Sequence, residues 1–121
     1  MPAVQLNHTI VAATDKRRSA EFLCRVLGLG PPAPAAHFLV VELANGVSLD
    51  FDDASHVEPQ HYAFLVADDD FGPVLARVRA EGVATFADPG HGVPGTNRRD
   101  GGQGFYFSDP DGHNLEVLTR A

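Results

Sequence analysis

The 121 residues are enough for one compact domain, and 44% apolar with 21% charged residues is ordinary for a globular protein with its own core. A formal net charge of −7 argues against nucleic acid or an anionic membrane as the main partner. The first residues lack the pattern of a signal peptide, and no apolar run reaches the roughly 18 residues of a membrane helix. We therefore expect a cytoplasmic protein.

The first expected elements are a strand over residues 7–15 and an amphipathic helix after it. Asp15 is a candidate N-cap of this helix and Gly28 a candidate C-cap. The single cysteine, Cys24, excludes an intramolecular disulfide and lies in the apolar part of the helix, which predicts a buried core residue. The apolar stripe consists of Phe22, Leu23, Val26 and Leu27.

A hairpin follows the helix, because Asn45 and Gly46 separate two β-type runs over residues 38–43 and 47–52. Residues 54–60, which contain Ser, His, Glu and Pro, suit a short linker.

The second half repeats this order of elements. Residues 60–68 align with residues 7–15, and each of these strand-like runs has a histidine second, His8 or His61, and an aspartate last. The sequence therefore predicts two copies of one module, residues 1–54 and 60–121.

A second helix follows His61, with an apolar stripe at helical spacing and Gly82 as its C-terminal signal. The acidic run 68–70 reads as helix capping rather than as a second metal site, and Pro73 is expected in the first turn. The stripe consists of Phe71, Val74, Leu75 and Val78.

The second module ends in a hairpin over residues 105–119, which turns at residues 109–112. It also carries a Gly- and Pro-rich loop over residues 88–103, of the kind that often forms a lid or a binding loop.

Strand alternation suggests a site on one face of these strands. Aligning the two hairpin glycines places Asp50 opposite Glu116, and each carboxylate alternates with apolar neighbours that would pack beneath the helices. If a pseudo-twofold axis relates the modules, His8 and His61 approach one centre. Two imidazoles and the Glu116 carboxylate then form a divalent-metal site with open positions for substrate.

The segments Leu6-Asn7-His8, His61-Tyr62-Ala63-Phe64 and, above all, residues 105–116 (FYFSDPDGHNLE) resemble the vicinal oxygen chelate superfamily of glyoxalases, bleomycin resistance proteins and dioxygenases. The resemblance covers nearly the whole chain. It implies an α+β domain of two paired βαβββ modules, with a curved mixed sheet around a concave metal site and helices on the outer face. It places metal ligands at His8, His61 and Glu116.

Asp50 falls where glyoxalase I relatives carry a glutamate ligand or base. It would ligate directly, bind through a water, act as a base or remain a solvated polar residue. With three protein ligands the centre suits Fe(II) and oxygen chemistry, whereas a fourth from Asp50 suits Ni(II), Zn(II) or Mn(II) and redox-neutral chemistry.

Other residues are candidates for binding the substrate. Arg98 and Arg99 are candidates to anchor a substrate carboxylate or phosphonate, with solvated loop residues as the alternative. Tyr106 would donate its hydroxyl to a bound anion or pack in the core. Tyr62 is expected to pack beneath a helix. The remaining histidines, expected in exposed turns and loops except for the undecided His37, are His113, His56, His91 and His37.

Two classes of function follow. The first is a metal-dependent enzyme, a lyase or isomerase or an extradiol-type dioxygenase, in which the metal chelates vicinal oxygens of a small substrate. Glyoxalase I proper is disfavoured because no basic residues for glutathione can be identified. Fosfomycin-type thiol transfer is an alternative, although Ile10 stands where those enzymes carry a substrate-binding threonine.

The second class is a metal-free protein that sequesters an antibiotic, as bleomycin-binding relatives do, and the retained ligands argue against it. The resemblance also implies a homodimer, and exchange of modules would join His8 and Asp50 of one subunit to His61 and Glu116 of the other.

Overall fold

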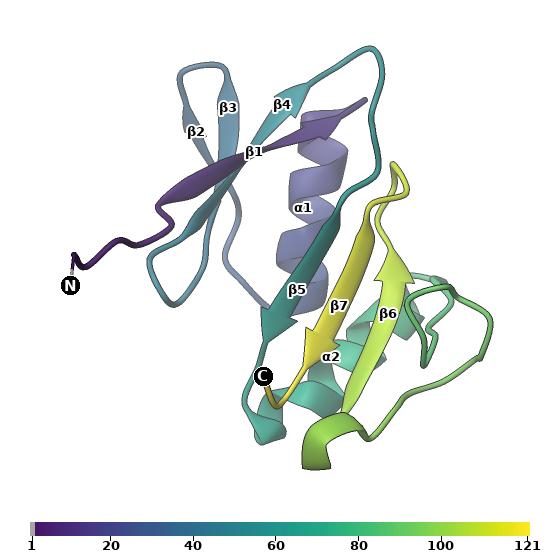
Figure 1. Cartoon of the computed structure of the whole chain (residues 1–121). Coiled ribbons are helices and arrows are strands. Elements are labelled where there is room, and N and C mark those ends of the chain that lie inside the picture. The colour runs from purple at the N-terminus through teal and green to yellow at the C-terminus, as the bar shows by residue number, and fades with distance from the viewer. Residues whose placement is uncertain (1) are drawn as a thin grey trace.

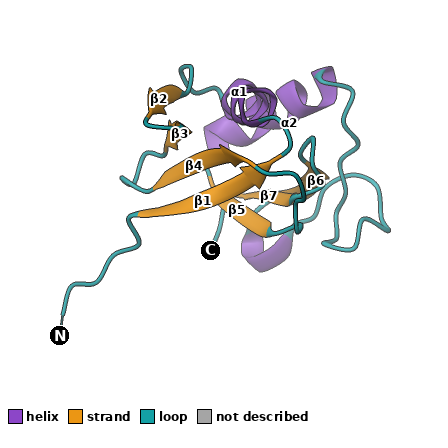
Figure 2. Cartoon of the chain, turned by 90° about the horizontal axis from the view of Figure 1, so that it is seen from above, coloured by secondary structure: helices purple, strands orange, loops and turns teal. Residues whose placement is uncertain are grey.

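The computed structural model describes residues 2–121, which fold into two mixed β-sheets and two α-helices (Figure 1). The first sheet has the strand order β1-β4-β3-β2 and the second β5-β7-β6. Residues before β1 extend away from the sheets (Figure 2). The elements are β1 (His8–Ala13), α1 (Lys16–Leu27), β2 (Ala33–Ala35), β3 (Phe38–Glu42), β4 (Ser48–Asp53), β5 (His61–Leu65), α2 (Asp68–Ala80), the short 3₁₀ helix η1 (Arg99–Gly101), β6 (Gly104–Ser108) and β7 (Asn114–Leu118).

The two sheets repeat one arrangement, since the first and last strands of each module pair in parallel, β1 with β4 and β5 with β7. Asp50 pairs with Ile10, and Glu116 pairs with Ala63. Each carboxylate therefore stands beside the residue two positions after its module's histidine. The predicted α+β class and the alignment of the two hairpins are confirmed.

The helix ends agree with prediction in α1 and differ in α2. The Asp15 side chain accepts a hydrogen bond from the backbone N–H of Arg18, and Gly28 has a φ of 73°, which a residue without Cβ adopts freely. In α2 the N-cap is Ala67, without a side-chain bond, so the prediction that the acidic run caps the helix is wrong. The three aspartates form the first turn, where the helix dipole favours them, and Pro73 lies one turn later than predicted.

One hydrophobic core joins both sheets and both helices. Alternate residues are buried in β1, β3, β4 and β7. Phe22 of α1 lies 6.3 Å from Phe107 of β6 and links the two modules, and Phe71 of α2 lies 5.5 Å from Phe105 within the second module. Cys24 is buried as predicted, and burial together with Glu21 raises the pKa of its thiol, which makes it less reactive. Within residues 2–121 no helix combines the length and apolar character that a bilayer span requires.

The turn between β6 and β7 fastens the second module to the first. Here the prediction of an exposed His113 is wrong, because its side chain is 1% exposed. Its Nδ1 accepts a hydrogen bond from the backbone N–H of Gln60 at 2.9 Å, so Nε2 carries the proton and donates to the carbonyl of Ala12 at 2.8 Å. The turn folds inward because His113 supplies hydrogen-bond partners to two backbone groups, Gln60 at the start of its own module and Ala12 in the other.

Asp111 makes a second link across the same seam. Its carboxylate accepts hydrogen bonds from the backbone N–H of Thr14 at 3.1 Å, from the Thr14 hydroxyl at 2.6 Å and from the Ser19 hydroxyl at 3.2 Å. The guanidinium of Arg18 lies 3.7 Å away. The start of α1 is thus held to the β6–β7 turn.

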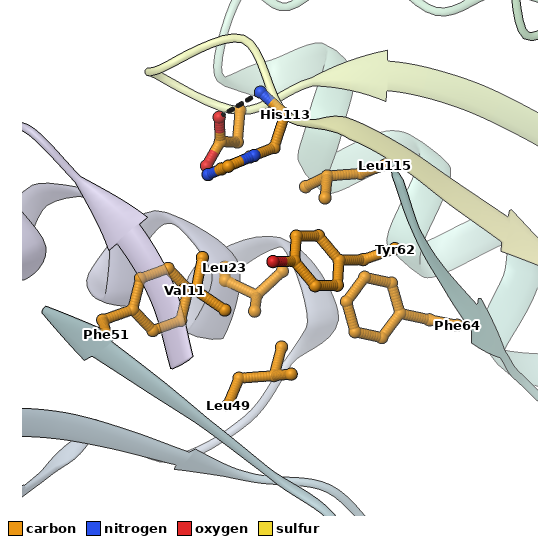
Figure 3. Close-up of a pocket in the computed structure, with 9 residues that line it drawn as sticks. Val11, Leu23, Leu49, Phe51, Tyr62, Phe64, His113 and Leu115 are labelled. Carbon is orange, nitrogen blue, oxygen red and sulfur yellow. Dashed lines mark hydrogen bonds between the residues drawn. The ribbon is translucent and has the colours of Figure 1, made fainter. Parts of the chain in front are cut away.

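Figure 3 shows the apolar side chains that meet beneath this turn, around a cavity of about 10 Å³. The ring of Tyr62 reaches into the seam toward Val11 and Leu23, and it stands edge-on to the imidazole of His113 at 5.6 Å. Tyr62 therefore faces the core, as alternation predicts. The cavity has room for one water molecule, so the modules are close-packed where they meet.

Candidate metal centre

His61 and Glu116 form the centre of the candidate site, on the face of the second sheet that is turned away from the core. His61 begins β5, and its Nε2 lies 3.0 Å from Oε1 of Glu116 in β7. The imidazole is 45% exposed and the carboxylate 16% exposed. The neighbours Tyr62 and Leu115 point to the core, which leaves His61 and Glu116 facing solvent.

This separation suits two ligands of one metal ion. Atoms that each lie about 2.1 Å from a metal and subtend a right angle at it are about 3.0 Å apart. In the chain alone the imidazole N–H donates to the carboxylate, and a divalent cation would replace that proton. Imidazole with carboxylate is a donor pair that Zn(II), Fe(II), Mn(II) and Ni(II) accept.

His8 does not join this pair within one chain. It begins β1, is exposed, and its Nδ1 lies 2.8 Å from the side-chain oxygen of Asn7. In the described part of the chain, no three side chains of His, Cys, Asp or Glu gather closely enough to hold a metal ion. One copy of the chain therefore brings together two of the three predicted ligands.

Asp50 also lies apart from the His61–Glu116 pair. It is half-buried on β4, and its Oδ1 accepts a hydrogen bond from the hydroxyl of Ser48 at 2.9 Å. In register, Ser48 pairs with His8. Asp50 is thus on the same face as His8, in the position that Glu116 has relative to His61.

Tyr106 borders the His61–Glu116 pair on β6, in register with Glu116. Its ring is 3% exposed and stands edge-on to His61 at 5.9 Å. Burial, and then the negative charge of Glu116, raises the pKa of the Tyr106 hydroxyl, so it stays protonated at neutral pH.

Arg99 and Arg98, predicted as a pair, differ in the contacts that their side chains make. Nη1 of Arg99 donates to the Tyr106 hydroxyl at 3.0 Å, and its guanidinium lies 5.6 Å from the centre of that ring. Arg98 is exposed and makes none of the side-chain hydrogen bonds or ion pairs found over residues 2–121. Arg99 therefore borders the candidate site, whereas Arg98 is a solvated loop residue.

The loop after α2 brings another histidine to this face. His91, predicted to be exposed, is half-buried: its Nε2 lies 2.8 Å from Oδ1 of Asn114, and its ring stacks on Phe86 at 4.5 Å. Asn114 pairs in register with His61. Sequence reasoning missed Asn114, although alternation from Glu116 already places it on the same face.

The other two histidines are outside the His61–Glu116 neighbourhood. His56 is exposed and pairs with Glu58, as predicted for a loop residue. His37, left undecided by the sequence, is exposed next to β3 and lies 3.7 Å from Asp52.

The fold agrees with the comparison to known proteins. Residues 5–117 match the model of the Glyoxalase/Bleomycin resistance protein/Dioxygenase superfamily. The chain belongs to this superfamily, the vicinal oxygen chelate group that its motifs resemble.

Three relatives are close enough to compare over most of their length. The solved structure of Oxidase ChaP-H1 is 56% identical, with a TM-score of 0.96, over 98% of both chains. Oxidase ChaP-H2 is 54% identical, with a TM-score of 0.96, over 99% of this chain and 96% of the other. Glutathione transferase FosA of Serratia marcescens is 36% identical over 121 residues, 93% of this chain and 78% of that protein.

Proposed function

We propose that this protein is a divalent-metal-dependent oxidative enzyme whose metal is held by His61 and Glu116 of one subunit and His8 of a second. The observation that carries the proposal is the 3.0 Å approach of His61 to Glu116 on an exposed sheet face. The retained ligands argue against the alternative of a metal-free antibiotic-binding protein.

The division of the ligands supports a homodimer with shared sites. β1 and β5 are edge strands, so each offers unpaired backbone groups to another chain. Exposed apolar side chains accompany these edges: Ile10 on β1 is 56% exposed, Leu65 on β5 is 64% exposed, and Leu6 before β1 is 68% exposed. Exchange of modules in a dimer would cover these residues and bring His8 of one copy to His61 of the other.

A metal bound by two histidines and a carboxylate keeps positions open, which supplies Lewis-acid chemistry toward vicinal oxygens and, for iron(II), chemistry with molecular oxygen. Two residues at the second sheet are placed to bind the substrate. Tyr106 stays protonated and is placed to donate a hydrogen bond to a substrate oxygen beside Glu116. Arg99, which has no carboxylate partner within 4.0 Å in the described chain, is placed to attract an anionic oxygen.

The relatives favour oxidation over thiol transfer. The two oxidases share 56% and 54% identity over nearly the whole chain, whereas the glutathione transferase shares 36%. This difference supports an oxidative reaction rather than the isomerisation or addition that a four-ligand centre would suit. The substrate class is a small molecule with neighbouring oxygens.

The test starts with anaerobic purification and metal analysis of wild type, His8→Ala and His61→Ala. We expect about one metal per chain in wild type and loss of metal in both variants. Oxygen uptake is then measured with catechol and enediol compounds, and glutathione conjugation of fosfomycin is measured in parallel. Absence of metal after addition of Fe(II), Mn(II), Ni(II) or Zn(II) would contradict the metal site, and conjugation without oxygen uptake would favour the transferase alternative.

A further inference from the structure

The loop after α2 is fixed against the second sheet rather than free to close over it. Backbone hydrogen bonds of 2.8 and 2.9 Å join Phe86 to Tyr106 at the edge of β6. The Asp88 carboxylate accepts hydrogen bonds from the backbone N–H groups of Gly92 at 2.9 Å and Val93 at 2.8 Å. These bonds hold the residues between them in one conformation, so the loop forms a preformed wall beside the candidate site.

His91 is the residue by which this wall meets the exposed sheet face. It has a φ of 58°, in the left-handed region that costs a residue with Cβ about 1–2 kcal/mol. The surrounding contacts outweigh that cost: the ring lies 4.5 Å from Phe86 at an interplanar angle of 12°, and Nε2 contacts Asn114. Strain of this kind, held in place by its surroundings, is often found at binding sites.

The hydrogen bonds of Asn114 place a proton on Nε2 of His91. Nδ2 of Asn114 donates to the carbonyl of Pro89 at 3.1 Å, which orients the amide. Its oxygen must then accept the hydrogen bond at 2.8 Å from Nε2–H of His91. In a neutral imidazole the other nitrogen, Nδ1, is an acceptor with a free lone pair.

Nδ1 of His91 is open to a ligand. No hydrogen bond to this atom exists in the described chain. No fully buried side-chain nitrogen or oxygen among those residues lacks a partner, so this unpartnered atom reaches solvent. Asn114, which holds the imidazole, is the register partner of His61. Asn114 thus connects His91 to the proposed metal ligand His61 on the neighbouring strand.

We propose that His91 is a substrate-positioning residue whose Nδ1 accepts a hydrogen bond from a substrate hydroxyl next to the oxygens that lie at His61 and Glu116. This inference rests on the proposed function and narrows its substrate class. The preferred substrate carries a third hydroxyl beside the chelating pair, and the imidazole acts through its fixed acceptor rather than through charge.

Catechol and pyrogallol test this directly, because they differ only in the third neighbouring hydroxyl. Under argon, the affinity of each compound is measured by how well it displaces the coloured probe 4-nitrocatechol from metal-loaded protein. The proteins compared are wild type, His91→Phe and His91→Asn. Phe preserves the stacking on Phe86, and Asn tolerates the left-handed backbone. We expect wild type to bind pyrogallol about five-fold more tightly than catechol, the value of one neutral hydrogen bond. Both variants lose this preference and keep their metal content and their affinity for catechol.

The matched control is His56→Phe, which replaces a histidine that is hydrogen-bonded to Glu58 in an exposed loop, and it keeps the preference. Nitrogen-15 spectra of the imidazoles give an independent readout, with the His91 proton expected on Nε2. A preference retained by both His91 variants, or a proton found on Nδ1, overturns the inference and leaves the proposed function standing. Metal-loaded wild type that binds neither phenol overturns the proposed function and this inference with it.

Discussion

Asp50 and Glu116 occupy the same register position in the two modules, yet their side chains have different partners. Glu116 pairs with the residue two positions after His61 and contacts that histidine at 3.0 Å. Asp50 pairs with the residue two positions after His8, but its carboxylate accepts a hydrogen bond from Ser48 at 2.9 Å. The aspartate is one methylene shorter, and Ser48 holds it along its own strand.

We therefore expect a centre with three protein ligands. Asp50→Ala should retain the metal content of wild type, whereas Glu116→Ala, its counterpart in the second module, should lose it. Metal analysis of both proteins after anaerobic purification measures the difference. Loss of metal from both variants would show that Asp50 is a fourth ligand.

The second prediction concerns the sharing of sites between subunits. His8→Ala and His61→Ala are each expected to lose the metal as homodimers. When equal amounts of the two variants are unfolded and refolded together, half of the dimers contain one chain of each variant. One of the two metal sites in such a mixed dimer has all its ligands. About one quarter of the wild-type metal content should therefore return.

Metal analysis and analytical ultracentrifugation of the refolded mixture check this result. Refolded samples of each variant alone are the controls and stay metal-free. A mixture that remains without metal would place all the ligands in one chain and contradict the exchange of modules.

The sequence predicted the parts of the site that local rules determine. Asn45 and Gly46 fix the register of one hairpin, and residues 109–112 fix that of the other, so alternation alone places Asp50 and Glu116 on the exposed face. The sequence did not determine where the two copies of the module meet. A pseudo-twofold relation brings two histidines together equally well within one chain or between two, and one chain leaves His8 apart from His61.

Two histidines whose positions depend on distant partners were predicted wrongly. His113 follows a turn, where exposure is the ordinary expectation. Its partner Ala12 is 101 residues away, and no periodicity reveals that contact. His91 likewise lies in a loop, and its partner Asn114 is 23 residues away.

The third prediction separates the two loop arginines. Arg99 contacts Tyr106 beside the proposed metal ligands, and Arg98 does not. Arg99→Ala should weaken the binding of oxalate, a dianion with neighbouring oxygens, by about ten-fold or more, since hydrogen bonds to charged groups are worth about 1.5–3 kcal/mol. Arg98→Ala is the matched comparison and should change binding less than two-fold, by about 0.4 kcal/mol or less.

Displacement of 4-nitrocatechol by oxalate measures both affinities, and metal analysis confirms that the two variants keep their metal. Equal losses in the two variants would indicate general electrostatic attraction rather than a bound anion at Arg99. Tyr106→Phe should weaken oxalate binding as well, because it removes the hydroxyl that holds the guanidinium.

The fourth prediction concerns the seam between the modules, where Asp111 receives hydrogen bonds from Thr14 and Ser19. Asp111→Ala should lower the free energy of unfolding at pH 7 by about 2–4 kcal/mol, because it leaves the buried hydroxyl of Ser19 without this acceptor and removes two hydrogen bonds to Thr14. Asp69→Ala, in the exposed first turn of α2, should change it by about 0.5 kcal/mol or less. Urea unfolding followed by circular dichroism measures both.

Acid pH tests the same carboxylate in a second way. Burial alone would raise the pKa of Asp111, but hydrogen bonds from Thr14 and Ser19 and the charge of Arg18 outweigh it and hold the pKa below the ordinary 3.8. A lowered folded-state pKa stabilises the fold above pH 3.8, and this contribution is lost as the pH falls through 3.8 toward the folded value. Asp111→Asn lacks the contribution at every pH. The stability difference between wild type and Asp111→Asn should therefore be largest at neutral pH and shrink below 3.8, whereas a difference independent of pH would show that the charge of Asp111 is not what the seam requires.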